Sequence, residues 1–246
     1  MSILSLKIAD FYFKINECFG YSDEGRFKFL EDKCSYSFEC VESDISYEKK
    51  LVNENIDVSE IGKTIILRKI SNWLPHHNAF LLHSACFDVG GVGVAFAAHS
   101  GTGKSTHMLN WQKVLGDNMT VVNGDKPIVR FFSQNEEKPD GVLPDIPYAY
   151  GTPWNGKERL GCNMRTHLQH ICFIERSKTN FVTKIDKNDA VNRIMNQVYM
   201  PKDPVALMNT LSLIDKLMSS CELWIIHCNM DVESAEVAYK TIFANC

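Results

Sequence analysis

The sequence lacks the two kinds of apolar segment that direct a chain to a membrane. No run of about 18 apolar residues occurs in its 246 residues, so no membrane-spanning helix is expected. Residues 1–25 have no basic start, no long apolar core and no cleavage site of the kind that defines a signal peptide. These absences predict a cytoplasmic protein with no membrane partner.

Paired cysteines are absent as well. The chain has nine cysteines, an odd number, and none of them forms the C-x-x-C pattern of zinc and redox sites. Several lie within apolar stretches, as in Ile171-Cys172-Phe173 and Ile226-His227-Cys228. We therefore expect buried free thiols in a reducing compartment.

The sequence also lacks clusters of basic residues. The formal net charge is −4, and the 26 lysines and arginines are scattered without a stripe. Nucleic acid is therefore not an expected partner. No internal repeat or low-complexity linker is visible, and the 45% hydrophobic content suffices for one large domain, or for one domain with a smaller appendage.

The most informative segment that is present is a glycine-rich loop. Residues 98–106 read Ala-His-Ser-Gly-Thr-Gly-Lys-Ser-Thr and follow the apolar run 92–97. This is the order of parts in a phosphate-binding motif: a strand, a glycine-rich loop, Lys-Ser/Thr and a helix. Gly101 and Gly103 can adopt backbone angles closed to other residues, so successive N–H groups can form an anion-binding nest. The helix expected from about Lys104 adds its positive N-terminal end.

Individual roles in the loop follow from this motif. Lys104 is expected to reach the β- and γ-phosphates, and the Ser105 hydroxyl to bind Mg²⁺, with Thr106 as the alternative hydroxyl. Ala98 stands where the strict motif has glycine, and a plain turn between strand and helix is the alternative interpretation. The residues expected to bind the nucleotide are Ser100, Gly101, Thr102, Gly103, Lys104, Ser105 and Thr106.

The strand before the loop belongs to a predicted hairpin. Residues 84–89 and 92–97 are apolar, and the two-residue connection Gly90-Gly91 predicts antiparallel pairing. Most nucleotide-binding α/β folds instead place the loop strand parallel to its neighbours. Further strands are expected at 119–123, 128–132, 169–175 and 223–228, and helices at 105–115, 186–199, 204–219 and from Asp231 or Ser234 to about Phe243.

The N-terminal part has a different pattern. Strands are expected within 3–14 and 26–41, a turn at 20–23 and a helix over 59–75. We expect residues 1–75 to form a small β-rich portion that packs on the remainder, and residues 76–246 to form an ATP-binding catalytic domain.

The stretch from His83 to Asp125 resembles the catalytic domain of HPr kinase/phosphorylase, a family that shares a fold core with ATP-dependent phosphoenolpyruvate carboxykinase. The matching features are His83 at the head of a strand, the hairpin 91–94, the loop 100–105, and the strand that ends in Asn123-Gly124-Asp125. The resemblance implies an α/β fold with a mixed-sheet P-loop kinase core. It also implies ATP and Mg²⁺ as cofactors. In that family two acids stand together, whereas here Lys126 follows Asp125.

Catalytic candidates follow partly from this resemblance. It implies that His83 faces the γ-phosphate and positions or deprotonates the acceptor, and that Asp125 is a Mg²⁺ ligand, a base, or both. A structural histidine and a turn aspartate are the alternatives. Lys157 and Arg159 lie in a loop that could close over the phosphates, or that could be a solvated surface turn. Trp154 could stack on a ligand or pack in the core, and Arg130 and Arg165 are weaker candidates.

Three functions remain open on the sequence. The leading one is a kinase that transfers the γ-phosphoryl group of ATP to a hydroxyl, either a serine of a protein or peptide or a small alcohol. The second is an ATP-binding regulator that does not transfer the phosphoryl group or hydrolyses ATP slowly. A carboxykinase-like lyase is the third. The resemblance also allows a homo-oligomer, since HPr kinases form hexamers.

Overall fold

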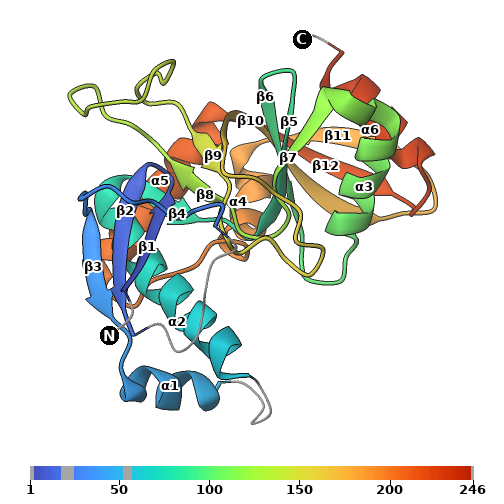
Figure 1. Cartoon of the computed structure of the whole chain (residues 1–246). Helices are drawn as coiled ribbons and strands as arrows, with labels where there is room; N and C mark the ends of the chain where they lie inside the picture. The colour runs from blue at the N-terminus through green and yellow to red at the C-terminus, as the bar shows by residue number, and fades with distance from the viewer. Residues whose placement is uncertain (1–2, 18–24, 52–56, 245–246) are drawn as a thin grey trace.

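The computed structural model describes residues 3–17, 25–51 and 57–244 (Figure 1). Within these ranges the chain is a mixed α/β protein with one three-stranded sheet and one nine-stranded mixed sheet. The turn expected at 20–23 lies outside the described residues. No helix in the described ranges is long and apolar enough to span a membrane.

The N-terminal portion is a small sheet covered by a helix. Strands β1 (Ile3–Ile8) and β2 (Phe11–Asn16) pair antiparallel, and β3 (Tyr36–Glu39) lies parallel to β2. The predicted strand 3–14 is therefore two strands, joined by Ala9-Asp10 in the left-handed conformation. Helix α1 (Glu42–Lys49) was not expected, α2 (Val58–Trp73) confirms the predicted helix, and a 3-10 turn, η1 (Leu74–His77), follows.

The large sheet has the order β4-β8-β9-β10-β6-β5-β7, with β12 paired to β10 and β11 to β12. Only the β6–β10 and β10–β12 pairs are parallel, so the sheet is mixed. Its strands are β4 (Ala79–Leu81), β5 (Ser84–Val89), β6 (Val92–Ala97), β7 (Met119–Asn123), β8 (Ile128–Arg130), β9 (Tyr148–Tyr150), β10 (Arg165–Arg176), β11 (Phe181–Ile185) and β12 (Glu222–Cys228).

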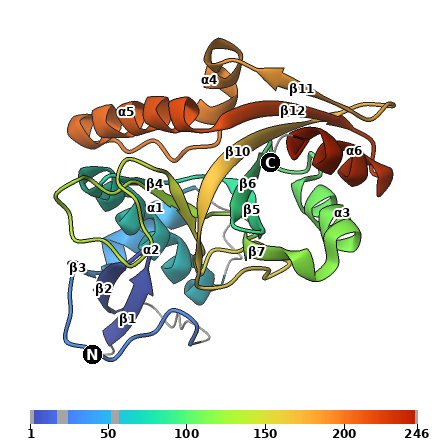
Figure 2. The ribbon, with the colours of Figure 1, turned by 90° about the horizontal axis from the view of Figure 1, so that it is seen from above.

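Helices cover both faces of this sheet. Figure 2 shows α3 (Lys104–Leu115) and α6 (Glu233–Ile242) on one side of β10 and β12, and α4 (Lys187–Met195) and α5 (Pro204–Ser220) on the other. A short 3-10 turn, η2 (Gly116–Asn118), follows α3. Along β10 successive side chains alternate between these layers, since Cys172 packs with the α3 side and Phe173 with the α4 side.

Several boundaries correct the expectations. Helix α4 ends at Met195 rather than at residue 199, and β8 ends at Arg130 rather than at residue 132. The N-cap of α6 is Val232, so neither Asp231 nor Ser234 caps it. Instead the Asp231 carbonyl accepts hydrogen bonds from both the backbone N–H and the hydroxyl of Ser234.

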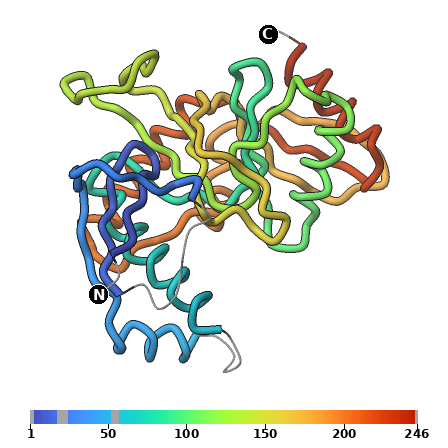
Figure 3. Tube along the Cα trace, viewed as in Figure 1, coloured from blue at the N-terminus to red at the C-terminus, as the bar shows by residue number. Residues whose placement is uncertain are grey.

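The two sheets share a hydrophobic core. Side chains of β1, β2 and α2 pack in one buried cluster with Ile128, Phe132, Tyr150 and Trp154. The backbone trace in Figure 3 shows the N-terminal portion lying beside this end of the large sheet. The expected packing of the N-terminal part on the rest is therefore observed, while the domain division after residue 75 stays a prediction. Among the described cysteines, Cys86, Cys172 and Cys228 are buried free thiols, and Cys40 is buried as well.

Candidate functional site

The glycine loop has the predicted strand–loop–helix geometry. Strand β6 ends at Ala97 and α3 begins at Lys104. Gly101 has φ of 77° and Gly103 has φ of 120°, so both use the conformational freedom for which glycine was expected. Among the described residues Ala98 is not one with positive φ, so alanine at this position causes no backbone strain.

The ammonium of Lys104 lies inside this loop. Its Nζ donates a hydrogen bond of 2.6 Å to the Ala98 carbonyl and one of 3.5 Å to that of His99, and the side chain is buried. Burial lowers the pKa of Lys104, the charge of Asp125 opposes that shift, and Lys126 adds to it. Ser105 and Thr106 are half-buried in the first turn of α3, and Ser100 is exposed.

The hairpin brings His83 to the start of the loop. Strands β5 and β6 pair antiparallel with Ser84 opposite Ala97, and Gly90-Gly91 form the turn with φ of 61° and 91°. His83 directly precedes Ser84, so this register places it beside the residue that follows Ala97. The predicted hairpin is confirmed.

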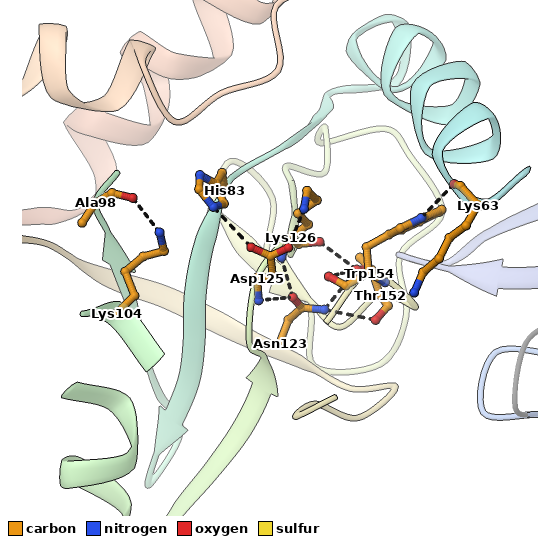
Figure 4. A network of polar contacts seen from close by, with 9 residues as sticks. All are labelled: Lys63, His83, Ala98, Lys104, Asn123, Asp125, Lys126, Thr152 and Trp154. Atoms are coloured by element: carbon orange, nitrogen blue, oxygen red, sulfur yellow. Dashed lines mark hydrogen bonds and ion pairs between the residues drawn. The ribbon is translucent and has the colours of Figure 1, made fainter. Parts of the chain in front are cut away.

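His83 and Asp125 form a contact that the sequence could only suggest. The Nε2 of His83 lies 3.2 Å from Oδ1 of Asp125, and Lys126 forms an ion pair with Oδ2 (Figure 4). Burial raises the pKa of Asp125, but the hydrogen bonds and charges of His83 and Lys126 outweigh it and lower that pKa to about 2. Asp125 is therefore a carboxylate at neutral pH.

A buried asparagine organises the backbone around Asp125. The Oδ1 of Asn123 accepts hydrogen bonds from the backbone N–H of Asp125, at 2.9 Å, and of Lys126, at 2.6 Å. Its Nδ2 donates to the carbonyl of Thr152 at 3.1 Å and to the hydroxyl of Thr152 at 3.0 Å. The motifs of the sequence assign no role to Asn123, although an asparagine before glycine at a strand end is a signal for such a turn.

The loop with Lys157 and Arg159 runs beside Asp125. A Cβ added at Gly156 would lie 3.2 Å from the Cβ of Asp125, and Gly124 N–H donates to the Leu160 carbonyl at 3.0 Å. Lys157 and Arg159 are exposed on this loop. The structure therefore places the backbone of this loop near the candidate site.

Trp154, on the same loop, packs inward. It is 4% exposed within the N-terminal core cluster, and its Nε1 donates a hydrogen bond of 3.1 Å to the carbonyl of Lys63 on α2 (Figure 4). Of the two alternatives for Trp154, packing is the one observed.

Two of the weaker arginine candidates have structural roles. Arg130 is buried between the rings of Phe11 and Phe132, forms an ion pair with Glu136 and donates to the Ala9 carbonyl. Arg165 donates to the carbonyl of Asp140 at 2.7 Å.

A different arginine, Arg176, reaches the glycine loop. Its Nη2 donates a hydrogen bond of 2.7 Å to the Gly101 carbonyl. The predicted strand 169–175 stops one residue short of Arg176, and the sequence gives no sign that this strand pairs with β6.

The donor types of Asp125 and Ser105 are those that Mg²⁺ takes in nucleotide sites. The described residues contain no group of three or more His, Cys, Asp or Glu arranged to hold a metal ion. Mg²⁺ in phosphotransfer sites is held by one or two carboxylates together with substrate phosphates, so such a group is not required. Asp125 is an ionised carboxylate, and Ser105 supplies a hydroxyl at the helix start.

Comparison with known proteins gives a distant structural likeness. No protein-family model and no curated protein matches the chain. Among solved structures, the Hpr(Ser) kinase/phosphatase from Coxiella burnetii is similar at 11% identity, over 56% of this chain and 96% of that chain, with a TM-score of 0.28.

Proposed function

We propose that the protein is an ATP-dependent phosphotransferase that moves the γ-phosphoryl group to a hydroxyl. The observation that carries this proposal is the position of Lys104 inside a loop with two left-handed glycines, beside the His83–Asp125 pair. Phosphoryl transfer needs mainly positioning and charge neutralisation, which a loop of N–H groups, a helix N-terminus and a lysine provide.

The low pKa of Asp125 favours one of its two candidate roles. A general base works best with a pKa near the operating pH, and a carboxyl with a pKa of about 2 is far below it. Asp125 therefore suits a metal ligand better than a base. When bound, Mg²⁺ would neutralise charge on the β- and γ-phosphates, with Asp125 and Ser105 holding it.

His83 then has the role of acceptor-side base. If its Nε2–H donates to Asp125, the imidazole is held in one tautomer and Nδ1 is left to take a proton from the acceptor hydroxyl. The hydroxyl oxygen would attack the γ-phosphorus as the bond to ADP breaks. Lys157 and Arg159, exposed on the loop whose backbone at Gly156 runs next to Asp125, are the cations that could neutralise the transferred group.

One observation favours a second function, an ATP-binding regulator without transfer. Lys126 forms an ion pair with the same carboxylate that would have to bind Mg²⁺. If the ammonium remains there after ATP binds, the metal role of Asp125 is blocked.

Tracing the γ-phosphoryl group separates these functions. With γ-labelled ATP and a panel of serine peptides and metabolites, a kinase places the label on an acceptor. A slow ATPase releases it to water, and a regulator leaves it on ATP. We expect His83→Ala to retain ATP binding and to lose transfer.

The matched control is His76→Ala, because His76 is an exposed histidine whose Nε2 lies 3.7 Å from Oδ2 of Asp203, on a different part of the chain. Full transfer by His83→Ala would remove His83 from the mechanism. Label found only on ATP in the wild-type protein would contradict the kinase proposal.

A further inference from the structure

Arg176, at the end of the neighbouring strand β10, donates hydrogen bonds to the backbone of the glycine loop. Its Nη2 donates to the Gly101 carbonyl at 2.7 Å, and its Nε lies 3.5 Å from the Thr102 carbonyl. Two nitrogens of one rigid guanidinium thus face two consecutive carbonyl oxygens. Lysine cannot reproduce this arrangement, since its ammonium is a single point of contact.

The strand pairing explains why Arg176 reaches the loop. Strand β10 runs parallel to β6, with Phe173 opposite Ala97, so the last residues of β10 lie beside the loop that follows β6. Arg176 has the same parity along the strand as Cys172 and Ile174, which pack on the α3 side. Its side chain therefore leaves the sheet on the face from which α3 begins.

The hydrogen bonds from Arg176 to the loop carbonyls also fix the direction in which the neighbouring N–H groups point. In a trans peptide the C=O and the following N–H point in opposite directions. A Thr102 carbonyl directed at Arg176 therefore turns the N–H of Gly103 away from Arg176. Without the guanidinium, the left-handed glycines would allow the same carbonyls to turn the other way, toward the negative phosphates.

We propose that Arg176 is a positioning residue that holds the loop carbonyls outward and so presets the N–H groups for phosphate. This inference rests on the proposed function, because it assigns a task within the same nucleotide site. In this role Arg176 touches the loop backbone and not the nucleotide itself. Its loss should therefore lower the affinity of the loop for phosphate groups.

Binding titrations with Mg-ATP and with inorganic tripolyphosphate test the role of Arg176. We expect Arg176→Gln to weaken both ligands by about tenfold, the range for loss of a charged hydrogen bond. The affinities of Arg176→Lys should lie between those of Arg176→Gln and wild type, because lysine keeps the positive charge but cannot donate from two nitrogens at once. Equal losses for the two ligands are expected because the loop contacts the phosphates alone.

The control is Lys178→Gln, which removes one exposed positive charge two residues away. It should bind both ligands as wild type does, and melting temperatures without ligand show whether each variant is folded. Wild-type affinity in Arg176→Gln, full affinity in Arg176→Lys or an equal loss in Lys178→Gln would overturn the role of Arg176. Absence of ATP binding by the wild-type protein would instead contradict the proposed function.

Discussion

At the scale of single residues, the site depends on how Asp125 is kept charged. Burial alone would favour the neutral acid, and the contacts with His83 and Lys126 reverse that preference. The folded pKa of about 2 lies below the ordinary value of 3.8. Asp125 therefore stabilises the fold above pH 4 or so, and this contribution is lost as the pH falls through the folded pKa.

The pH dependence of the unfolding free energy tests the contribution of the Asp125 carboxylate. Between pH 5 and pH 2 the wild-type protein should lose about 2 kcal/mol more unfolding free energy than Asp125→Asn, at about 1.4 kcal/mol for each pKa unit. Urea unfolding at a series of pH values measures the difference. Asp117→Asn, at an exposed position outside the site, is the control and should follow the wild-type curve. Parallel curves for wild type and Asp125→Asn would contradict the account.

Asn123 is the residue whose loss should be most costly near the site. Asn123→Ala leaves the half-buried N–H of Asp125 without its acceptor and removes one of the two acceptors of the Lys126 N–H. It also removes the buried donor to Thr152, so we expect a loss of about 3 kcal/mol in unfolding free energy. Asn163→Ala, at an exposed asparagine that donates to the Arg26 carbonyl, should cost less than about 1 kcal/mol. Similar losses in the two variants would show that the Asn123 hydrogen bonds contribute little.

At the scale of elements, the hairpin before the loop was predictable because its signal is local. Gly90-Gly91 between two apolar runs specifies the turn and the antiparallel partner. The pairing of β6 with β10 was not predictable, because about 70 residues separate the strands and no local pattern encodes parallel partners. For the same reason Arg176 was missed, whereas Lys104, Gly101 and Gly103 were found from their motif.

The two glycines of β6 and its turn should respond differently to alanine. A Cβ at Gly93 would lie 2.5 Å from the His167 carbonyl of β10, so Gly93→Ala must push the strands apart and should cost about 3 kcal/mol or more. Gly91 has open space but φ of 91°, so Gly91→Ala should cost only about 1 kcal/mol. Denaturant midpoints measure both changes. The opposite order would mean that turn strain outweighs strand packing.

At the scale of the whole molecule, the N-terminal portion and the site are joined through Trp154. The indole is bonded to α2, while the Trp154 carbonyl accepts from the N–H of Lys126 at 3.1 Å. The sequence suggested that the N-terminal part packs on the rest, but which surfaces meet depends on side chains far apart in the chain. Removal of residues 1–75 would uncover Ile128, Tyr150 and Trp154.

A fragment of residues 76–246 should therefore not fold stably alone. We expect it to melt at least about 10 °C below the full chain, or to aggregate, because apolar surface that the N-terminal portion covers would face water. Circular dichroism melts of the fragment and the full chain make the comparison. A cooperative melt of the fragment at the full-chain temperature would show that residues 76–246 fold independently.

The affinity for Mg-ATP tests the central claim most directly. Isothermal titration should give the wild-type protein a Kd between about 1 µM and 1 mM, the range usual for enzyme substrates. Lys104→Ala should weaken binding at least about 100-fold, since it removes the charge inside the loop. Lys113→Ala, which removes an exposed lysine from the same helix, should leave the affinity unchanged. Wild-type affinity in Lys104→Ala would contradict the assignment of this loop to the nucleotide phosphates.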